Sequence, residues 1–274
     1  MCVGGIANTA RRFDFLARAL MDRYHVVCLD WAGRGHSGWL AEMSDYTLDA
    51  HVEQLRCLLD HLGRDRVSII GSSMGGSAAL RLAYQQPWRV ERIVLNDIGP
   101  YIPLERRSRR AAVVGRHYVF RRPADLFRRS GAAQKNDGPV DDVVLAHNSF
   151  HQTRWSKEEG GRIYRHDPRA LLAYRHDARV SLNLWAEWDA ATCPLLVLWG
   201  ELSDALMDST VQRMQAKPGV TVALVPDTGH TPTLSDPVQG QMIRGWLSGD
   251  PLIGGDFSFL RRPTPRRILF GADG

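Results

Sequence analysis

Short apolar runs alternate with amphipathic stretches along most of the chain, which predicts strands that alternate with helices. The expected strands are the apolar runs at 1–5, 25–30, 67–70, 90–95, 194–199 and 220–225. The expected helices are the stretches with apolar residues every three to four positions, at 11–23, 48–62, 208–216 and 237–247. This order predicts an α/β fold, with a mostly parallel sheet and helices on both of its faces.

A serine stands between two glycines where the strand 67–70 passes into the next helix. Residues 71–75 read Gly-Ser-Ser-Met-Gly and fit the pattern G-x-S-x-G, with Ser73 at the tip of a strand-to-helix turn. Gly71 and Gly75 remove side chains that would crowd this strained turn. The following helix directs its free N–H groups toward the serine. The segment therefore predicts a nucleophilic serine.

Four polar residues, Ser73, Asp97, Asp204 and His230, come just after predicted strands. Because the carboxyl ends of parallel strands meet at one edge of a sheet, we expect all four at that edge. A serine nucleophile needs a base, and the base needs an acid that orients it. We expect His230 as the base and Asp204 as the acid. Asp97 is the alternative acid, unless it only caps the turn that follows its strand.

The segment 101–184 lacks the alternating pattern and is rich in arginine. It holds 17 Lys and Arg against 9 Asp and Glu, a surplus of 8, whereas the whole chain carries +5. The surplus is compatible with an anionic substrate, such as a carboxylate-bearing lactone or ring-fission product, or a CoA thioester. A solvated arginine-rich surface is the simpler interpretation. Residues 251–274 show no packing pattern and are expected to form a flexible basic tail.

The composition of the chain indicates where the protein is located and which classes of partner it binds. The four cysteines are scattered without a C-x-x-C pair, which favours reduced thiols in a cytoplasmic protein over disulfides or zinc. No apolar run approaches the roughly 20 residues of a membrane helix, and the start of the chain does not resemble a signal peptide. No nucleic-acid motif is present. We expect a small-molecule acyl substrate, no metal and no organic cofactor, while a homodimer stays open.

Taken together, these motifs resemble the α/β-hydrolase family of the esterase and ring-fission hydrolase kind. They span about residues 4–248: 13–20, Asp30-x-x-Gly33-x-Gly35-x-Ser37, 71–76, Leu95 to Pro100, Gly200 to Asp204 and Gly229-His230. The resemblance implies a core of residues 1–100 and 185–250, with 101–184 inserted as a helical cap. The serine at position 73 distinguishes the chain from relatives with an aspartate nucleophile.

The resemblance also implies an activity. We expect a serine hydrolase that cleaves a small carboxylic ester, lactone or thioester through an acyl-enzyme. A C–C bond hydrolase of ring-fission products and a non-catalytic binding protein are the alternatives. The backbone N–H groups of Ile6 and Met74 would form the oxyanion hole.

The chain departs from the family pattern at two points near its start. Gly4-Gly5-Ile6 stands where many members have His-Gly before the oxyanion residue. Two strands that usually precede this point are missing, which would leave residues 25–30 at an exposed sheet edge.

Overall fold

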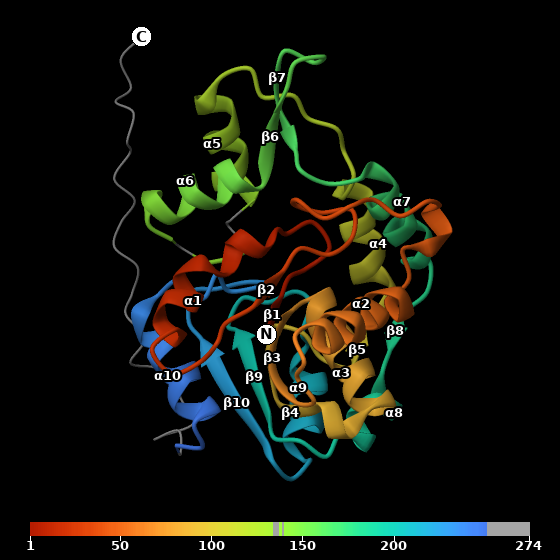
Figure 1. Cartoon of the computed structure of the whole chain (residues 1–274), viewed down its shortest axis with the longest axis vertical. Helices are drawn as coiled ribbons and strands as arrows, with labels where there is room; N and C mark the ends of the chain where they lie inside the picture. The colour runs from red at the N-terminus through yellow and green to blue at the C-terminus, as the bar shows by residue number, and fades with distance from the viewer. Residues whose placement is uncertain (134–136, 139, 251–274) are drawn as a thin grey trace.

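The computed structural model describes residues 1–133, 137–138 and 140–250, and its centre is a parallel sheet of six strands (Figure 1). The strands follow the order β10-β9-β4-β3-β1-β2. Their bounds are Cys2–Val3 (β1), Cys28–Leu29 (β2), Val67–Ser72 (β3), Val90–Asn96 (β4), Leu195–Gly200 (β9) and Val220–Val225 (β10). All the pairings between these strands are parallel, so their carboxyl ends meet at one edge, as the alternating pattern predicts.

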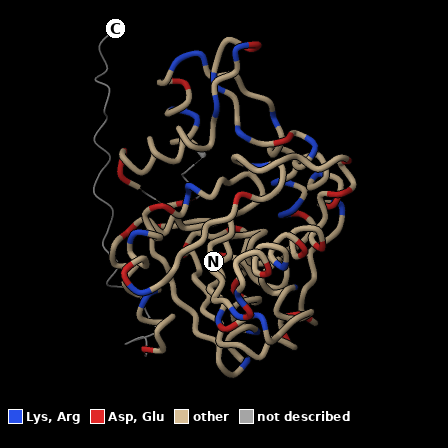
Figure 2. Tube along the Cα trace, in the orientation of Figure 1, with Lys and Arg blue, Asp and Glu red and all other residues tan. Residues whose placement is uncertain are grey.

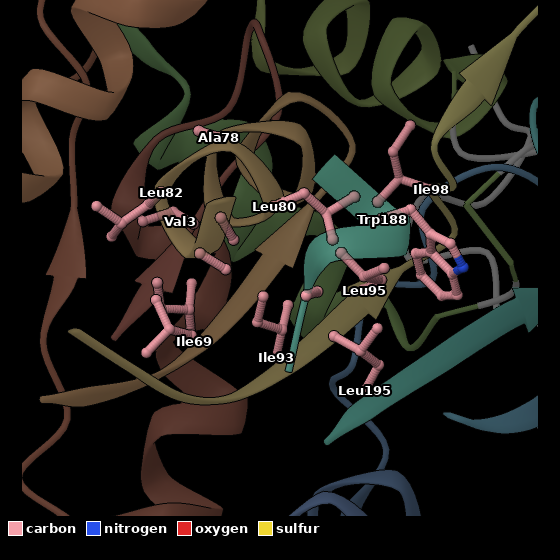
Figure 3. Close-up of a cluster of buried hydrophobic side chains, with 14 of the residues drawn as sticks. Val3, Ile69, Ala78, Leu80, Leu82, Ile93, Leu95, Ile98, Trp188 and Leu195 are labelled. Atoms are coloured by element: carbon pink, nitrogen blue, oxygen red, sulfur yellow. The ribbon is translucent and has the colours of Figure 1, made fainter. Parts of the chain in front are cut away.

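Successive residues of the central strands enter two different cores. Ile69 of β3 belongs to one buried cluster and Ile70 to the other, and Ile93 and Val94 of β4 divide in the same way. This follows from the two-residue repeat of a strand, which points neighbouring side chains to opposite faces. Continuous apolar runs such as 195–198 therefore serve both faces of the sheet, which a parallel sheet between two helical layers requires. Figure 3 shows the cluster that contains Ile69, Ile93 and Leu195.

The helices cover the two faces of the sheet in separate layers. On one side lie α2 (Leu48–His61), α3 (Met74–Gln85), α8 (Trp185–Ala190) and α9 (Asp208–Gln215). On the other lie α1 (Asp14–Leu20) and α10 (Pro237–Leu247). Figure 1 shows the sheet between these layers. The chain thus has the α/β architecture that the sequence predicts.

The observed bounds of the helices and strands agree best with the predicted ones where the buried side chains follow the local apolar pattern. Strand β10 and helix α10 have the predicted bounds, whereas β2 pairs over only two residues of the predicted run 25–30. Strand β2 also lies at the end of the strand order, at the sheet edge expected for this segment. The predicted helix 11–23 divides into a 3₁₀ turn at Ala10–Phe13 and α1. All four cysteines are free thiols.

An insertion, defined here as residues 101–184, separates β4 from α8 and β9. Its elements are β5 (Tyr101–Ile102), α4 (Leu104–Val113), α5 (Pro123–Ala133), α6 (Asp142–His151), β6 (Thr153–Ser156), β7 (Gly161–Tyr164), α7 (Pro168–Asp177) and β8 (Leu182–Asn183). The antiparallel pairs β6–β7 and β5–β8 were not expected from the sequence, which shows little strand pattern here. Both are short and need no long apolar run.

The insertion is hydrogen-bonded to the loop that follows β2. Asp167 N donates to Gly33 O at 2.7 Å, and Gly35 N donates to Arg165 O at 3.0 Å. Within the described ranges, no helix is both long and apolar enough to cross a membrane. The expected basic tail, 251–274, lies outside the described residues.

Candidate active site

Ser73 occupies the sharp turn between β3 and α3. Its backbone has φ 51° and ψ −118°, a conformation that non-glycine residues rarely adopt. The turn is possible because the backbone approaches itself closely at two glycines. A Cβ on Gly71 would lie 2.5 Å from the backbone of Gly76, and a Cβ on Gly75 would lie 2.3 Å from Val3 O. The strained turn therefore depends on glycine at both positions and presents Ser73 at the carboxyl edge of the sheet.

Three side chains from separate loops form a continuous hydrogen-bonded chain at this edge. Ser73 Oγ lies 3.2 Å from His230 Nε2, and His230 Nδ1 lies 2.9 Å from Asp97 Oδ2. An ionised carboxylate only accepts hydrogen bonds, so Nδ1 carries the proton and Nε2 is free to accept one from Ser73. The arrangement places a nucleophile, a base and an acid in the order in which a hydroxyl can be activated.

Asp97 is fully buried, and each of its oxygens accepts a hydrogen bond from a residue at or just after the end of β9. Gly200 N donates to Oδ1 at 2.9 Å, and Ser203 Oγ donates to Oδ2 at 2.6 Å. Its backbone adopts a positive φ of 50°, directly after the last residue of β4. A buried carboxylate stays ionised only when such donors replace water.

The expectation that Asp204 pairs with His230 is wrong. Asp204 accepts a hydrogen bond from Arg106 Nε of α4 at 2.9 Å, and its side chain is 56% exposed. The reason is the length of the loops. Asp97 follows β4 directly, whereas three residues separate β9 from Asp204, and the third of them, Ser203, is the one that reaches the carboxylate of Asp97.

The two expected oxyanion donors flank the serine. Met74 N opens helix α3, and neither it nor Ile6 N has a hydrogen-bond acceptor in the described part of the chain. The loop before Ile6 runs close to Ser73, since a Cβ on Gly5 would lie 3.4 Å from Ser73 Cβ. Asn8 shapes this loop by accepting from Gly5 N through its Oδ1 at 3.1 Å. Both N–H groups are therefore free to meet a ligand oxygen.

Arg34, which the sequence analysis did not single out, supports the same loop from behind. Its Nε donates to Ile6 O at 2.9 Å and its Nη1 donates to Ala32 O at 2.8 Å. The side chain is 1% exposed, and burial lowers the pKa of its guanidinium to about 10. His51 Nε2 faces Nη1 at 3.5 Å, and burial together with the Arg34 charge lowers the pKa of His51 to about 4. A neutral His51 can thus stand beside the buried cation.

Comparison with known proteins shows the family of the chain. The sequence profile of the alpha/beta hydrolase family matches residues 2–240. The chain belongs to this family. It is 32% identical over 259 residues to the 3-hydroxybutyrate-oligomer hydrolase of Cupriavidus necator. The match covers 91% of this chain and 88% of the relative.

Solved structures match the hydrolase over nearly its whole length. An alpha/beta hydrolase from Novosphingobium aromaticivorans has a TM-score of 0.79 and 30% identity, and the match covers 90% of this chain and 88% of that one. An esterase from Mycobacterium tuberculosis has a TM-score of 0.68 and 22% identity over 90% of this chain and 84% of that one. The second likeness concerns the fold alone.

The sequence of this hydrolase carries a signal for Asp97 but none for Arg34. Asp97 follows its strand without an intervening residue, and this direct succession distinguishes it from Asp204. Arg34 lies inside the glycine loop 33–38, but its burial depends on a contact with a loop far away in sequence, which no local pattern encodes. Among the described residues, no group of three or more His, Cys, Asp or Glu could hold a metal ion.

Proposed function

We propose that this hydrolase cleaves small carboxylic esters, and by the same chemistry lactones or thioesters, through an acyl-enzyme on Ser73. One observation carries the proposal: the hydrogen-bonded chain from Ser73 Oγ through both ring nitrogens of His230 to the buried Asp97. A hydroxyl is a weak nucleophile by itself, and a base held by a carboxylate is the arrangement that activates it.

In the first half-reaction, Ser73 Oγ attacks the acyl carbon while its proton passes to His230 Nε2. Asp97 stabilises the imidazolium form through its bond to Nδ1. The acyl oxygen becomes an oxyanion, which the N–H groups of Met74 and Ile6 would stabilise. The intermediate collapses when the bond to the leaving oxygen breaks and His230 gives its proton to the departing alcohol. The acyl group is then an ester of Ser73.

In the second half-reaction, water replaces the alcohol. His230 Nε2 takes a proton from the water as its oxygen attacks the acyl carbon, and the same N–H groups hold the new oxyanion. The bond to Ser73 Oγ then breaks, and Oγ recovers the proton from His230. The carboxylic acid leaves, and the site returns to its starting state without a metal or an organic cofactor.

The relative from Cupriavidus necator supports an ester as the scissile group. Its name describes a hydrolase of 3-hydroxybutyrate oligomers, and it matches this chain over 91% of the length. We therefore propose short linear hydroxyacid esters, with the dimer of 3-hydroxybutyrate first, as substrates to compare with general esters.

The test is the hydrolysis of p-nitrophenyl acetate and butyrate, and of the 3-hydroxybutyrate dimer, by the wild type and by Ser73→Ala. Ser77→Ala is the matched control. Ser77 is a buried serine of α3, the helix that begins directly after Ser73, and its side chain has no hydrogen bond within the described residues. We expect turnover that disappears in Ser73→Ala and persists in Ser77→Ala. Equal slow rates in three folded proteins would overturn the proposal.

A further inference from the structure

Lysine and arginine are distributed along the insertion (Figure 2), and four of the arginines lie within five residues of helix α4. Arg106 and Arg110 occupy positions i and i+4, which lie on the same side of a helix, whereas Arg107 lies next to Arg106 around the helix. Arg106 and Arg107 are buried and paired, the first with Asp204 and the second with Asp177 of α7. Arg106 and Arg107 therefore turn toward the rest of the protein, whereas Arg110 is exposed.

Arg110 differs from its two neighbours because no described residue accepts a hydrogen bond from its guanidinium. Its side chain stays accessible to solvent, although the protein packed around it lowers the pKa of the guanidinium by desolvation. Its electrostatic neighbours are two acids, one arginine and one tyrosine: Asp137, Asp204, Arg106 and Tyr174. Arg110 is therefore an exposed cation that has no hydrogen-bonded partner among the described residues.

Both acidic neighbours already serve other groups. Asp204 accepts from Arg106 Nε at 2.9 Å. Asp137 accepts from Arg12 Nη2 at 3.1 Å and from Thr231 Oγ1 at 3.1 Å. Neither carboxylate forms a hydrogen bond with Arg110, so the five donors of its guanidinium remain available to a ligand.

The same two acids locate Arg110 relative to the catalytic histidine. Asp137 is bonded to Thr231, which directly follows His230, and Asp204 directly follows Ser203, which is bonded to Asp97. One acid is thus bonded to the residue after His230, and the other follows the residue that is bonded to Asp97, so both lie near the His230–Asp97 pair. Because His230 gives its proton to the leaving oxygen, the departing alcohol must extend on the side of this pair.

We propose that Arg110 binds a carboxylate on the leaving alcohol, so that the substrates are esters whose alcohol part is a hydroxycarboxylic acid. The proposal rests on the proposed function for the position of the leaving group. A guanidinium matches a carboxylate with two parallel N–H···O bonds, and such charge-assisted bonds are strong where water is partly excluded. Arg110 then acts as a specificity-determining residue that touches the substrate away from the reacting bond.

The test uses three acetate esters that form the same acetyl-enzyme: 3-acetoxybutanoate, its neutral isostere 3-acetoxybutanamide, and 4-nitrophenyl acetate. Because deacylation is shared, differences in kcat/KM report recognition of the alcohol part. The variants are Arg110→Gln, Arg110→Lys and Arg109→Gln. Arg109 is the matched control, since it is an exposed arginine of the same helix without a partner in the described ranges. Ser73→Ala sets the background.

We expect the wild type to prefer the carboxylate over the amide by about 10- to 100-fold in kcat/KM, the range of a hydrogen-bonded charge. Arg110→Gln should remove this preference and leave the other two esters nearly unchanged. Arg110→Lys should keep part of it, and Arg109→Gln should keep all of it. No preference in the wild type, an equal loss on all three esters in Arg110→Gln, or the same loss in Arg109→Gln would overturn the proposal.

Binding separates this proposal from the proposed function. In Ser73→Ala the esters stay intact, so calorimetry can compare the Kd values of the carboxylate and the amide with and without Arg110→Gln. Tighter binding of the carboxylate that depends on Arg110 supports the site even if the wild type turns over no ester. Equal Kd values would overturn it. Absence of Ser73-dependent turnover contradicts the proposed function alone.

Discussion

Asp97 has no surface accessible to water, yet three hydrogen bonds reach its carboxylate. Gly200 N, Ser203 Oγ and His230 Nδ1 are the donors. A buried charge without donors would be protonated or strongly destabilising, so the donors are a condition for its ionised form. Asp204, in contrast, is half exposed and paired with Arg106. At the scale of single residues, the two aspartates thus differ in their surroundings rather than in their chemistry.

This difference predicts unequal effects of the same substitution. Asp97→Asn should lower kcat for 4-nitrophenyl acetate by about 10⁴-fold, because an amide cannot hold His230 in the required tautomer. Asp204→Asn should lower it by at most about fivefold, the loss of one partly exposed ion pair. Steady-state kinetics with circular dichroism as a check of folding measures both. A loss in Asp204→Asn as large as that in Asp97→Asn would contradict the assignment.

The strand β3, the turn at Ser73 and helix α3 form the element on which the site depends. The first turn of α3 lies against the end of β1, where Gly75 faces Val3 O, and Gly76 lies against Gly71. This contact brings the free N–H groups of the helix close to the loop of Ile6. At these contacts the backbones lie too close together for a side chain between them, so only glycine fits.

Gly75→Ala tests this packing. The new methyl group would lie 2.3 Å from Val3 O, and a backbone carbonyl cannot turn away as a side chain can. We expect the free energy of unfolding to fall by about 1–3 kcal/mol or more, together with a loss of activity. Urea unfolding followed by tryptophan fluorescence gives the change. Gly38→Ala is the control, since nothing lies within 4 Å of its Cβ position, and we expect a change below about 0.5 kcal/mol.

At the scale of the whole molecule, the loop after β2 joins the insertion to the loop that contains Ile6. Gly33 and Gly35 exchange backbone hydrogen bonds with residues 165–167, and Arg34 between them donates to Ile6 O. The buried Arg34 lies between His51 of the core and His166 of the insertion. Burial and the Arg34 charge lower the pKa of each histidine to about 4. The surroundings of His51 and His166 at this junction therefore favour the neutral form of both side chains.

The junction should lose stability in acid. Both histidines have a pKa near 4 when folded and about 6.5 when unfolded, so the unfolded chain binds more protons between these values. The free energy of unfolding should be fully retained above pH 6.5 and should fall toward pH 4. His51 alone, which is 3% exposed, would contribute about 2–3 kcal/mol to this loss.

His51→Gln tests the pH dependence through urea unfolding at pH 7 and pH 4.5. We expect a smaller drop between the two pH values than in the wild type, since glutamine does not titrate. His61→Gln is the control, because His61 is an exposed histidine at the end of the same helix. The idea fails if His51→Gln and the wild type lose the same free energy on acidification, or if the control changes the drop equally.

Much of the fold follows from local patterns. The strand 220–225 and the helix 237–247 have the predicted bounds because their apolar positions agree with the faces that they bury. The hairpin β6–β7 was not expected, since four-residue strands without an apolar run pair through contacts that the local pattern does not specify. The edge strand β2 is shorter than predicted, because only its last residues pair with β1.

The sequence by itself determined the elements whose cause is local: the strand-turn-helix of Ser73, the sheet with helices on both faces, and His230 after the last strand. Only the tertiary structure decided which carboxylate meets His230, because His230 stands 133 positions after Asp97 and the answer depends on how two loops end. The tertiary structure likewise decided the burial of Arg34 and the open position of Arg110. Both depend on which distant backbone or side-chain atoms the fold brings beside them, and no spacing along the chain encodes that.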